Sequence, residues 1–345
     1  MNYIGIDLHK TSSQVCILTE GGELVERRIK TDRDSFDSLL GGQAPAKILV
    51  ESSTESEWVA RHLEALGHEV IVADPNFAPM YATRDKRIKT DKRDARALCE
   101  ACRLGAYRPA HRTSDAQRDI RSHLAVRETL VRTRAKYISL IGALARQEGC
   151  RIGRGTSANF AARVAQAQLP AHVLAQVEPL LLMLATLNEQ IRKADERLAE
   201  VVRGDEVVRR LCSIPGVGPV IATTFAATLD GASRFQCARH VRSYLGLVPR
   251  EYSSGEKQHR GRISKAGNRR ARALLVEAAW SLLRWKTERT RALHEWWARI
   301  AQRRGKAVAA VALARKLAGI LFAIWRDGTE FDVRLLRSPD AAAAP

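Results

Sequence analysis

The sequence predicts an α/β domain at the N-terminus, a helical middle and a mostly helical C-terminal region. Three observations lead to this prediction. From residue 1 to about 110, short apolar runs alternate with amphipathic stretches and turn residues. Between residues 115 and 205, apolar residues recur at heptad spacing, which is typical of long paired helices. A turn rich in glycine and proline at residues 212–219 then separates two short helical segments. We expect domains at residues 1–110, 111–205 and 206–335, with a disordered tail at 336–345.

The composition points to a polyanionic partner. The 345 residues contain 57 Lys and Arg against 38 Asp and Glu, a net charge of +19. Nucleic acid is the commonest partner of so basic a protein, and an anionic membrane is the competitor. The sequence shows no signal peptide, no lipidation motif and no apolar run of 18 residues. We therefore expect a cytoplasmic protein.

The first 110 residues predict a β-β-β-α-β-α-β-α order. The first strand, around Ile4 and Ile6, is apolar enough to be covered on both faces. Strands are expected at residues 14–19, 23–30, 47–51 and 68–73, and helices at 33–40, 55–66 and 90–104. Thr90 is the expected N-cap of the last helix.

Four acidic residues are candidate metal ligands because the predicted topology can bring them to one sheet edge. Asp7 and Glu51 end two strands, and Asp91 and Asp94 share one face of the last helix. Crowded carboxylates raise one another's pKa unless cations neutralise them. Two divalent ions roughly 3.5–4 Å apart would do so and would hold a scissile phosphate. In the purely structural alternative, Asp7 caps a turn, and Asp91 and Asp94 complement the helix dipole.

The cysteines do not predict a disulfide framework. Six cysteines in a chain of this length are too few, and only Cys99 and Cys102 form a CxxC pair. Because no second pair follows at zinc-ribbon spacing, we interpret them as a helical packing pair rather than a metal site.

The middle region predicts a coiled coil. Leu184, Leu187, Ile191 and Leu198 belong to a heptad seam, and an earlier helix at about residues 116–147 carries its own repeat. Pairing within one chain and pairing between protomers both fit the sequence. Pro179 should break the second helix or start its main segment. The arginines of the first helix form either a solvated face or a nucleic-acid-facing surface, and residues 149–157 read as a flexible basic connector.

Residues 212–219, with the sequence CSIPGVGP, fit a helix-hairpin-helix motif. Gly216 and Gly218 allow close backbone approach, and Pro219 suits the first turn of the second helix. Free N–H groups at that helix start can hold a DNA phosphate without reading sequence. The structural alternative is a plain tight helical hairpin.

A basic stretch follows at residues 250–272, with eight Lys or Arg against two Glu. We interpret it as a flexible anion-binding loop around Ser253, Ser254 and Gly255, with Asn268 capping the next helix. Cations of this kind would stabilise a serine alkoxide and a phosphoryl transition state, although a serine that only grips phosphate fits as well. Further helices are expected at 269–286, 292–303 and 306–325. The candidate nucleic-acid contacts are Gly216, Gly218, Arg250, Lys257, Arg260, Arg262, Lys265, Arg269 and Arg270.

These motifs together resemble the DEDD transposases of the insertion-sequence one-ten family and the related Piv-type DNA invertases. The N-terminal motifs IGIDLHK, LVES and KTDKRDA resemble that family's RuvC-like domain. The motifs IPGVGP, YLGLVPR and RISKAGN resemble its transposase domain.

The resemblance implies a ribonuclease-H-like fold and Mg²⁺ held by Asp7, Glu51, Asp91 and Asp94. It also implies a nucleophilic serine at Ser254, with its neighbour Ser253 as the alternative. The implied partners are double-stranded DNA, a structured bridge RNA and further copies of the chain in a dimer or tetramer. Two alternatives are a RuvC-like junction-cutting endonuclease without a covalent intermediate and a non-catalytic DNA- or RNA-binding architectural protein. A sugar-kinase-like ATPase shares the opening strands, but no Gly-rich phosphate loop follows Asp7.

Overall fold

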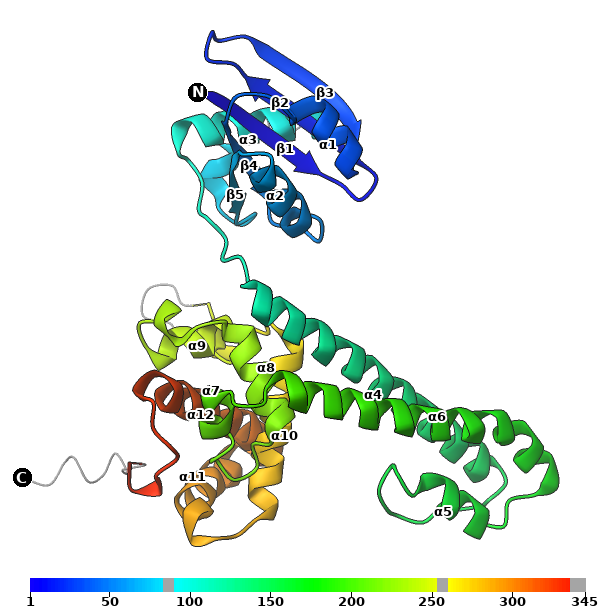
Figure 1. Cartoon of the computed structure of the whole chain (residues 1–345). Helices are drawn as coiled ribbons and strands as arrows, with labels where there is room; N and C mark the ends of the chain where they lie inside the picture. The colour runs from blue at the N-terminus through cyan, green and yellow to red at the C-terminus, as the bar shows by residue number, and fades with distance from the viewer. Residues whose placement is uncertain (83–89, 253–259, 336–345) are drawn as a thin grey trace, which may run out of the picture. The chain divides into compact units, whose positions relative to one another are not determined.

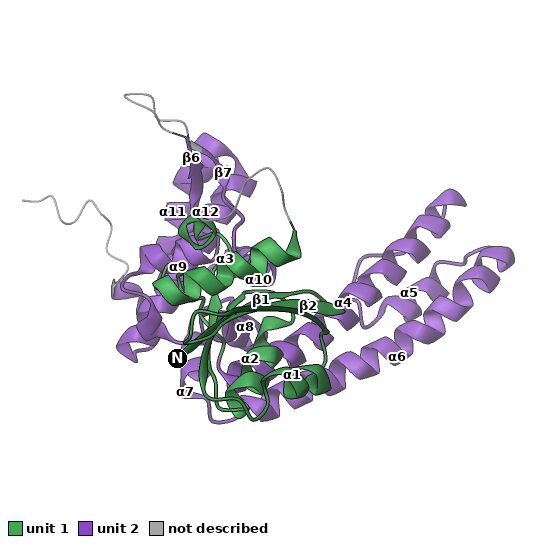
Figure 2. Cartoon of the chain, turned by 90° about the horizontal axis from the view of Figure 1, so that it is seen from above, with its two compact units in different colours: residues 1–113 green, residues 114–345 purple. Residues whose placement is uncertain are grey.

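The computed structural model describes residues 1–82, 90–252 and 260–335 of the chain. The chain divides into two compact units, Met1–Thr113 and Ser114–Pro345, which Figure 2 shows in different colours. The first unit contains all five strands of the large sheet, and the second is built mainly from helices (Figure 1).

The first unit confirms the predicted order of strands and helices. Its strands are β1 (Asn2–Leu8), β2 (Ser12–Leu18), β3 (Leu24–Lys30), β4 (Ala46–Glu51) and β5 (Glu69–Ala73). They form one sheet in the order β3-β2-β1-β4-β5, an order consistent with a ribonuclease-H-like domain. β1 lies at the centre, antiparallel to β2 and parallel to β4, and β4 is parallel to β5.

Helices cover both faces of this sheet, because each face carries buried apolar residues from several strands. On one face, Ile4 and Ile6 pack with residues of α1 (Arg33–Leu40) and α2 (Ser56–Ala65). On the other face lie α3 (Asp91–Leu104) and the short 3-10 helix η1 (Ala78–Tyr81). The expected N-cap of α3 is confirmed, since the Thr90 hydroxyl accepts a hydrogen bond from the backbone of Arg93.

The contact between α3 and β1 is so close that it requires glycine. A methyl group on Gly5 would overlap the backbone N of Cys99 and the carbonyl oxygen of Ala95, and it would lie 2.8 Å from the Cα of Cys99. These are backbone atoms of a helix, which cannot move aside as a flexible side chain can. Gly5 therefore sets the distance between the central strand and the helix that carries Asp91 and Asp94.

Cys99 and Cys102, the CxxC pair, lie in this interface between α3 and the sheet. Cys99 Sγ lies 3.2 Å from the carbonyl oxygen of Tyr3, and Cys102 Sγ lies 3.4 Å from that of Lys47. Both side chains are buried in apolar clusters between α3 and the sheet. Burial raises the pKa of the Cys102 thiol to about 11, which disfavours the thiolate that a metal would need. This environment is that of a packing pair.

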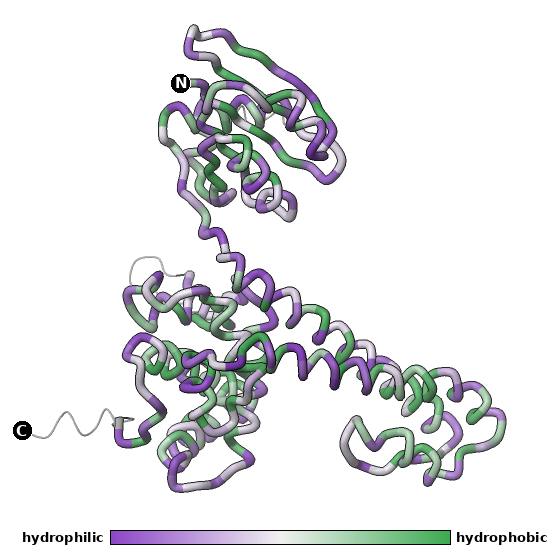
Figure 3. The backbone as a smooth tube through the Cα atoms, viewed as in Figure 1, coloured by the Kyte–Doolittle hydropathy of each residue, from purple (hydrophilic) through white to green (hydrophobic). Residues whose placement is uncertain are grey.

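The second unit begins with two long helices, α4 (Asp115–Gln147) and α6 (Ala171–Val201), which run antiparallel to each other within one chain. Arg134 Nη1 donates to Asn188 Oδ1 at 3.1 Å, and Arg127 pairs with Asp195 nearer the other end. Hydrophobic and hydrophilic residues alternate along both helices (Figure 3). Of the two pairings that the sequence allowed, the structure contains the one within a chain.

One detail of this region differs from the expectations, and one short helix was not specified by them. α6 continues through Pro179, so the prediction that this residue breaks or starts the helix is wrong. Val177 and Leu184 are buried on either side of it, and their packing offsets the hydrogen bond that proline cannot make. A short helix, α5 (Phe160–Gln166), also packs Phe160 and Val164 into the core between α4 and α6.

The rest of the second unit packs around the apolar helix α12 (Lys306–Asp327). Its partners include α7 (Glu206–Leu211), α9 (Ala238–Tyr244), α10 (Arg269–Arg284) and α11 (Glu288–Arg304), while α8 (Pro219–Leu229) contacts α4, α7 and α10. The predicted C-terminal helices are therefore confirmed. The 3-10 helices η2 (Ala232–Arg234) and η3 (Val333–Leu335) complete the unit, and the tail at 336–345 lies outside the described residues.

The interpretation of residues 250–272 as one flexible loop is wrong for residues 250–251 and 260–263, which lie in two short strands. β6 (Pro249–Glu251) and β7 (Arg260–Ile263) pair as an antiparallel two-stranded sheet. Their basic and polar residues lack the apolar alternation by which strands are recognised in a sequence. Asn268 does cap α10 as expected, since its side chain accepts a hydrogen bond from Ala271 N at 3.0 Å.

Two described helices, α6 and α12, are long and apolar enough to cross a membrane when judged by length and composition alone. Neither helix is an uninterrupted apolar run of 18 residues, since Glu178 interrupts α6 and Arg315 and Lys316 interrupt α12. The finding is weak, because a core helix passes the same test, and α12 buries Leu313, Leu317 and Leu321 completely.

We predict that Gly5→Ala will lower the stability of the first unit by about 1–3 kcal/mol, the usual cost of forcing a methyl group into a packed core. Hydrogen exchange of the β1 and α3 amides in the full chain measures the loss. Gly21→Ala is the matched control, because its methyl would lie 3.9 Å from the nearest atom, Thr19 Oγ1. Equal protection in both variants would contradict the close α3–β1 contact.

Candidate metal centre and nucleic-acid interface

Asp7 and Glu51 are placed next to each other by the register of two parallel strands. Ile6 of β1 pairs with Val50 of β4, so Asp7 and Glu51 follow at the same edge of the sheet. Asp7 is mostly buried, with 14% of its side chain exposed. The predicted convergence of two strand ends is therefore present.

The N-terminal turn of α3 brings the other two carboxylates. Asp91 and Asp94 both lie in this first turn, and the Gly5 contact holds the helix against β1. Asp94 is buried, whereas 52% of the Asp91 side chain is exposed. Helix-dipole stabilisation alone favours an exposed acid at this position and gives no reason to bury Asp94.

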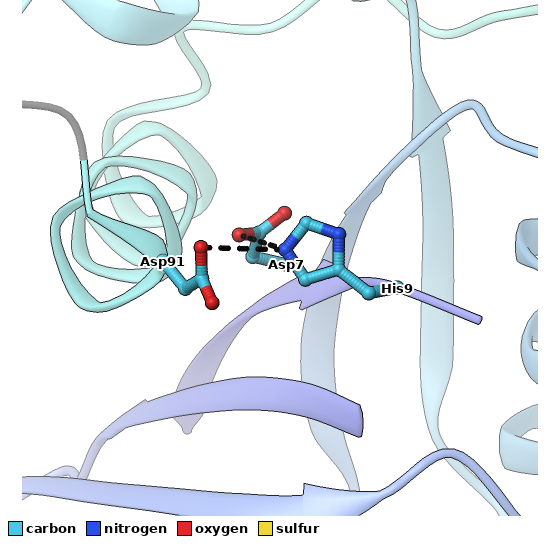
Figure 4. Close-up of side chains that lie close together, drawn as sticks. All are labelled: Asp7, His9 and Asp91. Atoms are coloured by element: carbon cyan, nitrogen blue, oxygen red, sulfur yellow. Dashed lines mark ion pairs between the residues drawn. The ribbon is translucent and has the colours of Figure 1, made fainter. Parts of the chain in front are cut away.

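His9 lies between two of these acids and was missed by the sequence analysis. Its Nε2 is 3.3 Å from Asp7 Oδ2 and 3.4 Å from Asp91 Oδ1 (Figure 4). One ligand atom from each of the three residues falls within 4.8 Å of the others, a spacing suited to one metal ion. The motif IGIDLHK contains His9, but nothing in the sequence shows that Asp91 lies on its other side.

The electrostatics of Asp7 link all four acids. Burial raises the pKa of the Asp7 carboxyl most, the nearby His9 lowers it, and repulsion from Asp94, Asp91 and Glu51 raises it further. These three carboxylates therefore act on Asp7 from two other elements, β4 and α3. A cation placed among them would reverse the repulsion.

Tyr81 holds Glu51, and this is a second contact that the sequence did not reveal. The Tyr81 hydroxyl, at the end of η1, donates a hydrogen bond to Glu51 Oε2. Such a bond orients a carboxylate, as the partners of metal ligands commonly do. Carboxylate oxygens and one imidazole nitrogen are suitable donors for a divalent ion. The residues therefore form an acidic cluster that can hold a divalent metal.

The residues of the predicted hairpin motif form the turn between α7 and α8, and the two glycines of this turn differ in their surroundings. A methyl on Gly216 would lie 2.7 Å from the backbone N of Leu282, so Gly216 packs against α10. Gly218 caps α8, Pro219 follows it, and a methyl at Gly218 would meet no atom within 4 Å. Only Gly218 leaves room for a ligand at its Cα.

The basic stretch near the second sheet contains both exposed and internally paired residues. Arg250, Arg262, Lys265 and Arg269 are exposed. Arg270 instead forms an ion pair with Glu128 of α4 at 2.7 Å, and burial lowers the pKa of its guanidinium. Arg260 belongs to β7, while Ser253, Ser254 and Lys257 lie outside the described residues, in the segment that joins β6 to β7.

Arg272 organises the start of α10 and was not recognised as distinct within the basic stretch. Its Nη1 donates to the carbonyl oxygens of Leu245, Ala266 and Gly267 at 3.2, 2.7 and 3.0 Å. The backbone of Lys265 also donates to Gly246 at 3.1 Å. The motifs YLGLVPR and RISKAGN therefore pack against each other, and together they hold the ends of the β6–β7 sheet.

Comparisons with known proteins identify the family of this chain. A transposase family named for DEDD and for the insertion sequence IS110 matches residues 4–147, and the family described as "Transposase IS116/IS110/IS902 family" matches residues 208–295. A "Probable family 20 transposase" of Pseudomonas aeruginosa is 34% identical over 94% of this chain and 96% of its own. The transposase for insertion sequence element IS1328 of Yersinia enterocolitica is 32% identical, over 95% and 98%. That for IS1111A of Coxiella burnetii is 29% identical, over 93% and 88%.

These matches, with which the fold of the first unit is consistent, define a transposase of the DEDD class, an enzyme that cuts DNA. The chain belongs to the IS116/IS110/IS902 transposase family.

The raised pKa of Asp7 predicts how stability depends on pH. Because the fold favours the protonated carboxyl, the free energy of unfolding of metal-free protein should fall as pH rises through the raised pKa. Asp7→Asn should remove this part of the decline and stabilise the metal-free first unit near neutral pH, by about 1 kcal/mol.

Chemical denaturation in a chelator, from about pH 4 to about pH 8, measures the effect. Glu23→Gln, which removes an exposed carboxylate, is the control and should leave the profile unchanged. A profile for Asp7→Asn that follows the wild type would contradict the crowding of these carboxylates.

Proposed function

We propose that this transposase is a recombinase that moves or inverts a DNA element through Mg²⁺-dependent cleavage and strand exchange. The observation that carries this proposal is the meeting of Asp7, Asp91 and His9, with the repulsion that Asp94 and Glu51 exert on Asp7. Two Mg²⁺ ions held by the four acids would supply charge to polarise the scissile phosphate and its attacking oxygen.

In this mechanism Ser254 is the nucleophile. Its Oγ forms a bond to phosphorus as the bond from phosphorus to the deoxyribose oxygen of the cut strand breaks. The serine proton passes to the surroundings, and the leaving oxygen gains a proton. Attack by a hydroxyl of the new strand then releases Ser254 and regenerates a phosphodiester, so no high-energy cofactor is needed.

The chain's own residues supply the remaining functions. The charges of Arg250, Arg262, Lys265 and Arg269 would hold the DNA backbone beside Ser254, because all four are exposed near the ends of β6 and β7. Lys257 and Arg260 belong to the same basic stretch. Gly218 would admit a phosphate at the start of α8, as a helix-hairpin-helix does.

We further propose that a structured bridge RNA and other copies of the chain complete the assembly. The resemblance to the insertion-sequence one-ten family implies the RNA partner, and the net charge of +19 is compatible with it. The α4–α6 pair, acting as a coiled coil, would be the contact region of a dimer or tetramer. The active sites would then combine both domains from different protomers.

We predict that Ser254→Ala will abolish a covalent protein–DNA adduct on element-end DNA, while duplex binding stays within about twofold. Denaturing electrophoresis of labelled DNA after quenching measures the adduct. Ser253→Ala is the matched control and should keep it. An adduct formed by Ser254→Ala would pass the role to Ser253 or end the mechanism. Cleavage without any adduct in wild type would favour a junction-cutting nuclease.

We also predict that Asp7→Asn and Glu51→Gln will each lower Mg²⁺-dependent cleavage by about a hundredfold or more, because loss of even the outer partners of metal ligands costs 10- to 100-fold. Gel-based cleavage assays measure the rates, with Glu23→Gln as the control. Unchanged cleavage in both variants would instead support an architectural nucleic-acid-binding protein.

A further inference from the structure

An unusual group of cations lies where α9 crosses α12 in the second unit. Arg242 belongs to α9, and Arg315 and Lys316 belong to α12. All three side chains are partly buried. Arginine and lysine in such positions normally have a carboxylate partner, because burying an unpaired charge is costly.

Within the part of the chain that the structure describes, no carboxylate pairs with any of the three. The Nε atoms of Arg242 and Arg315 are both shielded from solvent and have no hydrogen-bond partner among the described residues. Lys316 Nζ has instead an aromatic neighbour and lies 5.0 Å from the centre of the Trp296 ring. Two buried donors of this cluster, the Nε atoms of Arg242 and Arg315, are therefore unsatisfied.

The fold brings these cations together through a glycine in α12. A methyl on Gly319 would overlap Nη2 of Arg242 and would lie 2.8 Å from its Cζ, so the guanidinium rests on the helix backbone at this residue. Arg315 precedes Gly319 by one helical turn and lies on the same face of α12. Gly319 is therefore the position that lets Arg242 approach Arg315.

Like-charge repulsion adds to the cost of this arrangement. Burial and then the charge of Arg315 lower the pKa of Arg242, and burial, Arg242 and Arg299 lower the pKa of Lys316. An arrangement that disfavours its own charges in the isolated chain is typical of a binding site, where a ligand of opposite charge supplies the compensation.

We propose that Arg242, Arg315 and Lys316 form a phosphate-binding site that grips one phosphodiester of a nucleic-acid backbone. Phosphate suits this site because a guanidinium presents paired N–H donors that match two phosphate oxygens. None of the three residues belongs to the basic stretch at residues 250–272. The identification of the ligand as nucleic acid rests on the proposed function. Both the element DNA and a structured RNA contain the required group.

The test measures binding of a labelled DNA duplex and of a labelled structured RNA by fluorescence anisotropy over a range of salt. We expect Arg242→Gln and Arg315→Gln to weaken binding of one of these ligands by about tenfold and to reduce the salt slope by about one contact. The ligand affected identifies the source of the phosphate. Arg291→Gln is the matched control, because it removes an equal charge from an exposed side chain that pairs with Glu288.

Thermal unfolding of the ligand-free chain separates binding from a structural role. Because each cation is uncompensated in the isolated chain, Arg242→Gln and Arg315→Gln should leave Tm unchanged or raise it by a few degrees. Gly319→Ala provides a second variant, since its methyl displaces only the flexible end of Arg242 while alanine favours the helix. It should weaken the same ligand without lowering Tm.

Unchanged affinity and salt slope for both ligands in all three variants would overturn the proposal, as would a large fall in Tm for Arg242→Gln together with normal binding by Gly319→Ala. Neither result depends on catalysis. Repeating the binding measurements in the Asp7→Asn background keeps them independent of cleavage, so the proposed recombinase mechanism can fail while the phosphate site stands, and the reverse also holds.

Discussion

The close contact between α3 and β1 at Gly5 is the constraint on which the candidate metal centre depends. Asp7 belongs to the strand and Asp91 and Asp94 to the helix, and these elements meet because Gly5 has no side chain. The parallel register of β1 and β4 adds Glu51 at the same edge. Folding energy from the apolar faces of the sheet thus forces together carboxylates that repel one another, and burial followed by this repulsion raises the pKa of Asp7. A divalent cation is the simplest means of resolving it.

Much of the first unit could be predicted from the sequence, because its apolar runs have the period of strands and helices and their ends are marked by caps such as Thr90. Asp7 and Glu51 could be placed at strand ends for the same reason. His9 and Tyr81 could not, since their partners lie far along the chain and no local pattern shows the meeting. Pro179 misled the prediction because packing around α6 outweighs local propensity.

In the second unit too, local sequence patterns predicted the helices, whereas the contacts between distant residues could not be predicted. The heptads of α6 predicted a long helix but left its partner open, and the structure supplies α4 of the same chain. Arg270 was predicted to contact nucleic acid because it lies in a basic stretch, but in the structure it forms an ion pair with Glu128. Arg242 and Arg315 carried no signal in the sequence, because only the crossing of α9 and α12 at Gly319 brings them together. The sequence therefore predicts the net charge of the chain, but it does not predict which residues each charged side chain contacts in the fold.

The most direct test of the central claim is anomalous X-ray diffraction from crystals of the full chain grown with saturating Mn²⁺, which substitutes for Mg²⁺. We expect one or two anomalous peaks within bonding distance of Asp7 and at least one of Glu51, Asp91 and Asp94. Mn²⁺ found only elsewhere in the molecule, with these carboxylates free of metal, would contradict the account.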